Sequence, residues 1–426
     1  MVELDTARGV RDINPSEEML REEITDNFKN IFASYGFVPL NTPIIEKYEI
    51  LSAKFAAGEE SDAMAETYKL EDNGKRKLGL RFDLTVPLSR YIGMNRTTKM
   101  PFKRYQIGKV YRDAPIKEGR YREFTQCDVD IIGSKDMLAD ATCINVAIDA
   151  YKTVGVDVEI QVNNRNFFIA LMIKEGVAEL DASSVMMSID KLDKLGVDGV
   201  LADAKQKGFS EDIVQKILNL LNIQGSNEEK LNFFKAMLPD NEGLAELEEL
   251  LSYFKTSNVV FTPTLARGLG YYTGTVFEVY AKENKKIGAI GAGGRYDNLI
   301  GSYLGGSRDF PAVGISFGLD RIVDVLKKLN KAKLSKSRTK VFIVPLGTKK
   351  ESMEIAKKIR DAGVTVDIDL MNRGPSKNFQ YADSQGIPFV AVIGEDELRD
   401  GVISLKELAT RNEEKITVEE AIKKLT

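Results

Sequence analysis

The pattern of apolar residues changes twice along this chain, and the change limits what the chain can fold into. Up to about residue 167, and again over 255–326, short apolar and β-branched runs alternate with polar loops. Residues 168–254 instead have the pattern of one short helix after another, and over 341–426 strands and helices alternate. A chain of 426 residues is also too long for one ordinary hydrophobic core. We therefore predict three parts, the first of which is split by the second.

A long hairpin is the clearest feature of the first part. Residues 101–133 contain two apolar runs on either side of a polar loop at 113–119. A helix is predicted to start at Asn14-Pro15-Ser16 and to end at Gly36, with a strand at 37–40. Further strands that could pair with the hairpin are predicted at 259–262, 275–280 and 287–292. Together these segments predict an α+β fold, with helices packed on a mostly antiparallel sheet.

The last part, 341–426, has a different pattern. Extended segments such as VFIVPL and FVAVIG alternate with helical segments such as ESMEIAKKIRDAG, which predicts a small α/β domain with a largely parallel sheet. Residues 327–340 join it to the rest and hold seven basic residues and no acidic one. Such a run is typical of a solvated linker, and a local basic patch is the alternative.

The sequence contains no histidine, and this excludes several kinds of catalytic site. A Ser-His-Asp triad, a Cys-His pair, an HExxH zinc site and a histidine general base all require one. Catalysis must therefore rest on arginine, carboxylates, hydroxyls, backbone dipoles or a bound metal. No protein side chain is assigned to a metal.

Composition indicates a cytoplasmic protein with no membrane segment. The polar, acidic N-terminal segment is unlike a signal peptide, and no stretch approaches the roughly 20 apolar residues that cross a bilayer. The two cysteines, Cys127 and Cys143, provide no disulfide framework. The net charge of −4 argues against indiscriminate nucleic-acid binding, because that mode relies on a large positive surface.

Two arginines stand out in the hairpin. Arg112 and Arg120 lie on opposite sides of its loop, so the hairpin would bring both guanidinium groups towards one polyanionic ligand. Arginine suits phosphate because its planar fork donates two parallel, charge-assisted hydrogen bonds. The alternative is a set of surface ion pairs with Asp113, Glu118 and Glu123.

Residues 264–280 form a second cluster. Arg267 lies among small residues and is followed by Tyr271 and Tyr272, whose two hydroxyls would need partners in a core strand. Residues 288–301 are rich in glycine but match neither a P-loop nor a dinucleotide motif.

Residues 312–322 predict a strand of small residues that enters a helix, with Arg321 one turn into that helix. The alternative is a capped amphipathic helix that carries an exposed arginine.

In this order, and with LRFDLT at 80–85 before them, these segments resemble the histidyl-tRNA synthetase family along nearly the whole chain. The helix and strand that reach Pro43 resemble class II motif 1, residues 102–130 resemble motif 2, and residues 313–321 resemble motif 3. RGLGYYTGTVFE and GAGGRYD resemble the two signatures that distinguish the histidine enzyme from other class II synthetases.

The resemblance implies a class II catalytic domain, built on a six-stranded antiparallel sheet with flanking helices, in residues 1–167 and 255–326. It implies that the inserted helical domain, 168–254, reaches the tRNA acceptor arm, and that 341–426, beyond the linker 327–340, bind the anticodon. Such an enzyme uses ATP and Mg²⁺ to convert L-histidine to histidyl-adenylate, and transfers the histidine to the 3′ end of tRNA(His). A homodimer formed through motif 1 is also implied.

The resemblance also implies roles for individual residues. In the ATP site, Arg112 would hold the α-phosphate, Arg321 the γ-phosphate, and Arg120 would lie beside them. Arg267 would stabilise charge at the α-phosphate, so Arg267 and Arg112 are the expected catalytic residues. The expected histidine-binding set comprises Asp83, Thr85 and Gln126 at the α-amino group, Asp130 and Tyr272 at the imidazole, and also Tyr271 and Arg267.

Two positions depart from the family pattern. Gly270 stands where an aspartate is usual, beside the imidazole pocket, and Ala114 stands where motif 2 commonly has a glutamate. Three other hypotheses remain: a regulatory, non-catalytic relative such as the synthetase-like subunit of the first histidine-biosynthesis enzyme, a class II enzyme for proline or threonine, and an RNA-binding or structural protein.

Overall fold

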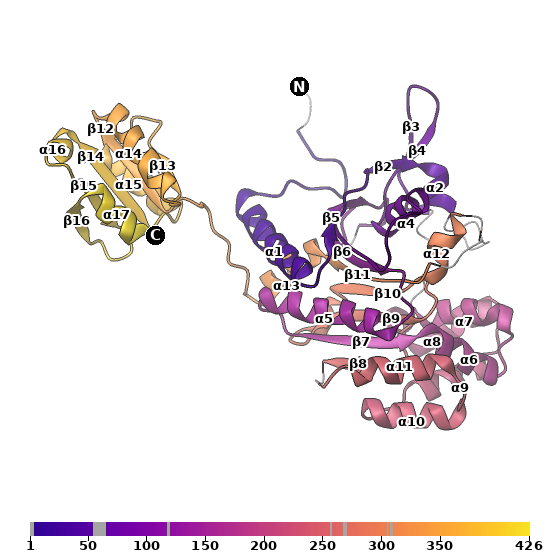
Figure 1. The fold of residues 1–426 in the computed structure, drawn as a ribbon. Coiled ribbons are helices and arrows are strands. Elements are labelled where there is room, and N and C mark those ends of the chain that lie inside the picture. Colours follow the sequence, from indigo (N-terminus) through magenta and orange to yellow (C-terminus); the bar gives the residue numbers. More distant parts are fainter. Residues whose placement is uncertain are drawn as a thin grey trace. The chain divides into compact units, whose positions relative to one another are not determined.

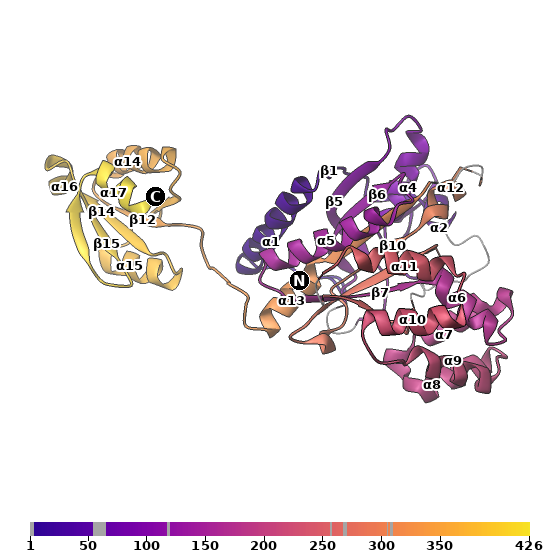
Figure 2. The same cartoon turned by 60° about the horizontal axis from the view of Figure 1, so that its bottom comes forward.

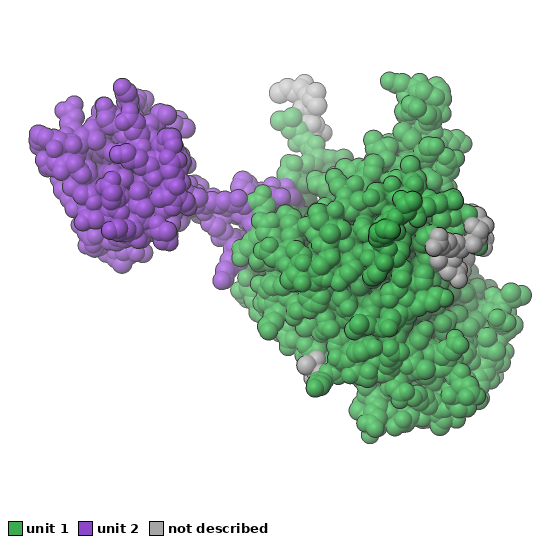
Figure 3. Space-filling view, in the orientation of Figure 1, with its two compact units in different colours: residues 1–12, 21–332 green, residues 13–20, 333–426 purple. Residues whose placement is uncertain are grey.

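The computed structural model describes residues 4–53, 65–116, 120–255, 258–266, 271–304, 306 and 310–426. Contacts divide the chain into two compact units, which Figure 3 colours: residues 1–12 with 21–332, and residues 13–20 with 333–426. The division passes through the first helix, α1 (Pro15–Ser34), which begins where the sequence predicts and ends two residues before the predicted Gly36. No helix among the described residues is long and apolar enough to cross a membrane.

Eight strands form the main sheet of the larger unit, in the order β1-β5-β6-β11-β10-β9-β7-β8 (Figures 1 and 2). They are β1 (Val38–Pro39), β5 (Phe102–Tyr111), β6 (Glu123–Ile132), β7 (Val158–Asn164), β8 (Val259–Phe261), β9 (Thr275–Ala281), β10 (Gly291–Arg295) and β11 (Ala312–Gly318). The six inner strands are antiparallel to one another, while β1 and β8 pair in parallel at the edges. The predicted antiparallel-rich sheet is confirmed, and the predicted hairpin is the β5–β6 pair.

The two faces of this sheet differ in polarity. One face is apolar and packs on α1 and α5 (Met137–Thr153), which lie side by side in Figures 1 and 2. Phe317 of β11 lies at the centre of this packing. Its ring centroid is 5.3 Å from that of Phe28 in α1 and 5.5 Å from that of Tyr151 in α5. Because side chains alternate along a strand, the opposite face receives the polar residues of β5 and β6. That polar face carries the candidate site.

The strand β10 differs from its prediction. The sequence pattern predicted a strand at 287–292, but the chain forms a short 3-10 helix, Lys285–Ile287, and the strand begins only at Gly291. An added Cβ at Gly293 would lie 2.1 Å from the carbonyl oxygen of Gly314, so the close approach of the neighbouring strand β11 requires glycine there. The prediction relied on apolar side chains, and this strand is built from residues that have almost none.

A three-stranded sheet, in the order β2-β4-β3, precedes the hairpin in the chain. Its elements are β2 (Ile45–Lys47), α2 (Tyr48–Ala53), β3 (Lys69–Glu71) and β4 (Lys77–Leu80), and α4 (Thr85–Met94) follows. Arg81 joins this part to the hairpin, because its Nη1 donates to the Thr42 carbonyl at 2.6 Å and its Nε donates to the Lys109 carbonyl at 2.9 Å. Residues 81–85 are thereby held beside β5.

The predicted helical segment is confirmed as a run of six helices. They are α6 (Arg165–Lys174), α7 (Ala182–Ile189), α8 (Leu192–Gln206), α9 (Glu211–Leu221), α10 (Asn227–Met237) and α11 (Glu242–Ser252), with a 3-10 turn at Glu179–Asp181. Ser226 caps α10, since its hydroxyl accepts from the Glu229 amide while Glu229 reaches back to the Ser226 amide. Figures 1 and 2 show α6 to α10 gathered on one side of the larger unit. Two further helices, α12 (Asp297–Ser302) and α13 (Leu319–Lys328), follow β10 and β11.

The smaller unit contains a five-stranded sheet in the order β13-β12-β14-β15-β16. Its elements are β12 (Val341–Leu346), α14 (Lys349–Asp361), β13 (Val366–Ile368), α15 (Pro375–Ser384), β14 (Phe389–Gly394), α16 (Glu395–Arg399), β15 (Ile403–Glu407), β16 (Glu413–Ile416) and α17 (Val418–Leu425). The α/β prediction is confirmed, but the sheet is only partly parallel. β13, β12 and β14 are parallel, whereas β15 and β16 are antiparallel because a tight turn at Gly401 and a hairpin reverse the chain.

Candidate active site

The floor of the site is the polar face of β6. Gln126, Asp128 and Asp130 occupy alternate positions of this strand and therefore share one face. Glycines lie opposite them in the register: Gln126 is flanked by Gly108 and Gly318, and Asp130 by Gly314. An added Cβ at Gly314 would lie 2.1 Å from the Asp130 carboxylate, so this glycine leaves the space that the carboxylate occupies.

Asp130 belongs to a buried ionic group. Its carboxylate lies 2.7 Å from the Nη2 of Arg104 and accepts a hydrogen bond from the Tyr296 hydroxyl. Arg104 is fully buried and also donates to the Leu84 carbonyl at 3.1 Å. Burial raises the pKa of Asp130, and Arg104 and Tyr296 oppose that shift. The carboxylate of Asp130 is thus held in one orientation.

Gln126 and Asp128 are connected through Ser316 of β11. The Gln126 Nε2 donates to the Ser316 hydroxyl at 2.7 Å, and Ser316 pairs in register with Asp128. Asp128 is 3% exposed, and burial raises its pKa to about 7. Gln126 and Ser316 are half-buried, so they lie at the open side of this chain of contacts.

Asp83 and Thr85 lie at the beginning of α4. The Asp83 carboxylate accepts from the Val86 amide at 2.9 Å, in the first turn of this helix, of which Thr85 is the first residue. Asp83 is close enough to Asp128 and Asp130 to raise the pKa of both. The structure therefore brings Asp83 to the carboxylates of β6.

Arg112 follows β5 directly and is half-buried. Its Nε donates to the Phe82 carbonyl at 3.1 Å, and its guanidinium carbon lies 5.1 Å from the centre of the Phe124 ring. Burial lowers the pKa of Arg112, whereas Asp83, Glu66 and Tyr271 raise it. Arg112 thus lies among the predicted site residues.

The predicted surface ion pairs are formed differently. Asp113 pairs with Arg122 at 2.8 Å and Glu123 pairs with Lys109 at 2.6 Å, while Glu118 lies outside the described residues. Arg120 does form an ion pair, but with Glu66 at 2.7 Å, a residue that the sequence did not suggest.

Arg321 lies in the first turn of α13, just beyond the end of β11, and its Nη1 donates to the Ala289 carbonyl at 2.8 Å. The last residue of β11, Gly318, pairs with Gln126, near the start of β6. The last residue of β5, Tyr111, pairs with Glu123, the first residue of β6. Arg112, which follows Tyr111, and Arg321 are therefore at the same end of the sheet. Asp130 lies farther along β6 towards the other end.

The tyrosine pair lies next to the ionic group of Asp130. The ring centroids of Tyr271 and Tyr272 are 4.6 Å apart, and Tyr271 lies 6.4 Å from the ring of Tyr296, which contacts Asp130. Arg267 and Gly270 fall in 267–270, outside the described residues. Ala114, the second departure from the family pattern, is buried.

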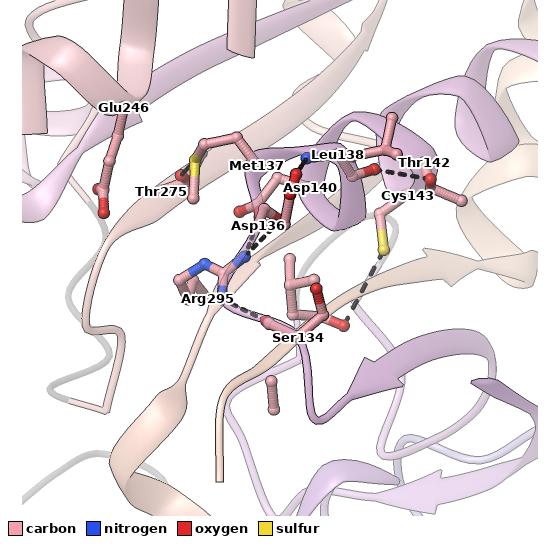
Figure 4. Close-up of polar contacts among 12 residues, drawn as sticks. Ser134, Asp136, Met137, Leu138, Asp140, Thr142, Cys143, Glu246, Thr275 and Arg295 are labelled. Atoms are coloured by element: carbon pink, nitrogen blue, oxygen red, sulfur yellow. Dashed lines mark hydrogen bonds and ion pairs between the residues drawn. The ribbon is translucent and has the colours of Figure 1, made fainter. Parts of the chain in front are cut away.

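A buried ion pair anchors the glycine-rich strand (Figure 4). Arg295, the last residue of β10, pairs with Asp140 of α5 and donates to the Ser134 carbonyl at 2.9 Å. The Thr273 amide donates to the Arg295 carbonyl at 2.8 Å, and the Thr273 hydroxyl donates to Asp297 at 3.0 Å. This network connects the segment after the tyrosine pair to β10 and α5.

Several residues of the site were not identified from the sequence. They are Arg104, Asp128, Tyr296 and Ser316, which lie in the hairpin, the glycine-rich stretch and the segment 312–322. Their contacts run between strands, so they depend on the register of β5, β6 and β11. The polar members of the apolar runs, at every second position, are the signal that could have drawn attention to them.

Comparisons with known proteins match nearly the whole chain. Residues 9–322 match the family model described as histidyl-tRNA synthetase, and residues 340–426 match the model described as anticodon binding domain. A protein of Bacillus cereus named histidine–tRNA ligase 1 is 39% identical, with 98% of each chain covered. The histidine–tRNA ligase of Clostridium tetani is 37% identical, with 97% of this chain and 96% of the relative covered.

Solved structures give the same likeness. The crystal structure of histidyl-tRNA synthetase from Nostoc sp. PCC 7120 covers 100% of both chains with a TM-score of 0.86 and 30% identity. A Bacillus halodurans structure, described as an ATP phosphoribosyltransferase regulatory subunit/histidyl-tRNA synthetase, has a TM-score of 0.76 at 23% identity and covers 92% of this chain and 99% of that one. At that identity the likeness concerns the fold alone.

Proposed function

Because the chain belongs to the histidyl-tRNA synthetase family and is a histidine–tRNA ligase, we propose how its residues divide the work of that reaction. ATP would bind at the end of the sheet that carries Arg112 and Arg321, and L-histidine would bind over the polar face of β6. The observation that supports this division is that Gln126 and Asp130 share one sheet face, while Asp83, just before α4, lies near both Asp130 and Arg112.

At the ATP end, Arg112 would hold the α-phosphate, Arg321 the γ-phosphate, and Arg120 would exchange its contact with Glu66 for the nucleotide. The histidine carboxylate attacks the α-phosphate in line and releases pyrophosphate. This step needs positioning and charge neutralisation, because the carboxylate is already a nucleophile. A chain without histidine can therefore catalyse it. Arg267 would stabilise the charge that develops at the α-phosphate.

Mg²⁺ would enter with ATP as part of the substrate and share the phosphate charge with the arginines. Among the described residues, no group of three or more carboxylates and cysteines is arranged to hold a metal ion by itself. The proposed magnesium would therefore be bound mainly through phosphate oxygens.

At the histidine end, Asp83, Thr85 and Gln126 would receive the α-amino group, and Asp130 with Tyr272 would bind the imidazole, with Tyr271 alongside. The contacts of Arg104 and Tyr296 fix the Asp130 carboxylate in advance. A pocket that hydrogen-bonds both ring nitrogens would leave buried polar groups unpaired around a wrong amino acid. Selectivity for histidine would follow without an editing domain.

tRNA(His) would contact both units. We propose that residues 1–167 and 255–326 form the catalytic domain, that 168–254 contact the acceptor arm, and that 327–340 act as a linker to the anticodon-binding residues 341–426. We further propose a homodimer, formed through α1 and the segment that reaches Pro43, in the cytoplasm. Sedimentation at several protein concentrations tests the dimer: a single monomer-sized species at all of them contradicts it.

A regulatory relative is the competing hypothesis, since the Bacillus halodurans structure shares the fold. The anticodon-binding match at 340–426 and the retained Arg112 and Arg321 favour the enzyme.

Amino-acid-dependent ATP–pyrophosphate exchange, run with each of the twenty amino acids, tests the proposal. We expect exchange with histidine alone, and its loss in Arg112→Ala and Arg267→Ala. Exchange with another amino acid would refute the assigned specificity. No exchange in a folded protein would favour the regulatory relative, with Gly270 or Ala114 marking the lost site.

A further inference from the structure

The three arginines assigned to ATP come from separate parts of the chain, and one segment contacts residues next to all three. Arg112 and Arg120 lie on the two sides of the hairpin loop, and Arg321 lies in α13. The segment consists of residues 8–11, which precede α1 and belong to the larger unit. The family likeness assigned no role to these four residues.

The first contact of this segment is with the base of the hairpin loop. The Gly9 carbonyl accepts from the Arg122 amide at 2.8 Å, and the Arg122 carbonyl accepts from the Arg112 amide at 2.9 Å. Gly9 has a φ of 84° and follows a turn in which the Val10 amide donates to the Ala7 carbonyl at 3.1 Å. An added Cβ at Gly9 would lie 2.7 Å from the Cδ of Arg122. The segment therefore approaches the loop so closely that it requires glycine there.

The second contact is made by Arg11, which joins the loop to the helix of Arg321. Its guanidinium carbon lies 4.5 Å from the centre of the Tyr121 ring, and its Nη2 lies 3.5 Å from the Asp320 carboxylate. Tyr121 directly follows Arg120 in the chain. Asp320 directly precedes Arg321. Arg11 thus connects the neighbours of two arginines that belong to different elements.

Asp320 is held firmly at its end of this contact. It is 5% exposed and accepts from the Arg21 Nη1 and from the Thr125 amide, each at 2.8 Å. Arg21 lies in α1 and Thr125 lies in β6, so the start of α13 is tied to both of these elements. Residues 8–11 join the hairpin loop to the same framework.

We propose that residues 8–11 set the spacing between the arginines of the hairpin loop and Arg321, and thereby the fit of the triphosphate of ATP between them. Guanidinium groups on two elements must meet one triphosphate at the same time, and paired arginine–phosphate hydrogen bonds depend on geometry. Gly9 and Arg11 are then positioning residues, because they act through Arg122, Tyr121 and Asp320. The inference rests on the proposed assignment of ATP to the three arginines.

Arg11→Met tests the proposal, because methionine removes the cation and keeps an apolar side chain. Asp320 keeps its contacts with Arg21 and Thr125 in this variant, so the fold should remain intact. In ATP–pyrophosphate exchange with the full chain, we expect the KM for ATP to rise about fivefold, the factor that corresponds to one lost cation–π contact. The KM for L-histidine should change by less than about twofold.

Two variants accompany Arg11→Met. Arg11→Lys keeps a cation that can contact both Tyr121 and Asp320, and it should restore most of the affinity for ATP. Arg76→Met is the matched control, because it removes an exposed arginine and its ion pair from the same unit, and it should change neither KM.

Gly9→Ala tests the contact with the base of the loop. The added methyl group would displace Arg122, so the KM for ATP should rise about threefold or more, again without a matching change for L-histidine. Gly155→Ala is the matched control, because Gly155 also has a positive φ, 71°, but its added Cβ would meet nothing within 4 Å. Both variants strain the backbone in the same way, so a rise in the KM for ATP in Gly9→Ala alone reports the contact with Arg122.

Arg321→Ala separates this inference from the assignment beneath it. If Arg321→Ala raises the KM for ATP while neither Arg11→Met nor Gly9→Ala does, the assignment holds and the proposed role of residues 8–11 is refuted. Equal rises of the two KM values in Arg11→Met would also overturn that role, because they indicate a general disturbance of the fold. If Arg321→Ala leaves the KM for ATP unchanged, the assignment itself fails and the inference falls with it.

Discussion

At the scale of single residues, Asp128 shows a conflict between stability and function. Its carboxylate is buried beside Asp83 and Asp130, and Arg104 is the cation that faces it. Burial raises its pKa to about 7, so the folded protein holds this charge at an energetic cost near neutral pH. Asp128 lies between Gln126 and Asp130 on the polar face of β6, so this costly charge lies beside residues assigned to histidine.

The sign of this effect gives a prediction for Asp128→Asn. Between the pKa of the unfolded chain, about 4, and the folded value of about 7, the native state binds more protons, so wild-type stability falls as the pH rises through this window. Asparagine does not titrate, so the variant lacks this pH-dependent loss of stability. We expect the free energy of unfolding of Asp128→Asn, relative to that of the wild type, to rise by about 2–4 kcal/mol between pH 4 and pH 7. Above pH 7 this difference should stay constant. Denaturant titrations at pH 5 and pH 8 measure the difference, and a difference that does not change with pH would contradict it.

At the scale of elements, the buried pair of Arg295 and Asp140 joins the end of β10 to α5 (Figure 4). Burial raises the pKa of Asp140 to about 6, and the attraction of Arg295 opposes this shift. A strand that consists mainly of glycine buries few side chains, so we infer that this pair is a main anchor of β10. Its removal would also loosen the segment of Thr273, whose amide bonds to the Arg295 carbonyl.

We therefore predict that Asp140→Ala destabilises the larger unit by about 3–5 kcal/mol, because it leaves the buried Arg295 charge with only the longer contact to Asp297, at 3.4 Å. The matched control is Asp361→Ala, which breaks an exposed pair with Lys357 in α14 and should cost less than about 0.5 kcal/mol. Thermal and denaturant unfolding measure both. Similar small effects in the two variants would mean that β10 is held by its strand pairings alone.

The sequence predicts some of these strands correctly and misplaces others. The β5–β6 hairpin was predictable because its apolar and β-branched residues follow a strand pattern up to the loop. β10 was misplaced because glycine carries no such pattern, and its strand exists through the close approach of Gly293 to Gly314. Asp130 was assigned through the family likeness, but its contacts with Arg104 and Tyr296 depend on which residues the pairing of strands brings together. Local patterns do not specify that register.

At the scale of the whole molecule, the proposed chemistry and the proposed anticodon contacts fall in different parts of the chain. The residues assigned to histidine and ATP lie between Asp83 and Arg321, within the match to the synthetase model. The smaller unit has its own hydrophobic core, in which Val341 and Ile343 of β12 pack with Ile359 of α14 and Leu425 of α17. Activation of histidine and recognition of the anticodon should therefore be separable by truncation.

We predict that a chain ending at Ala332 retains histidine-dependent ATP–pyrophosphate exchange within about threefold, because the assigned groups and the sheet that positions them remain. Its aminoacylation of tRNA(His) should fall by at least about a hundredfold in kcat/KM, since the contacts with the anticodon contribute binding energy that the truncated chain lacks. Full-length Arg112→Ala is the opposite control and should lose both reactions. If truncation abolished exchange as completely as aminoacylation while the sheet remained folded by circular dichroism, residues 333–426 would have to contribute to the chemistry of activation itself.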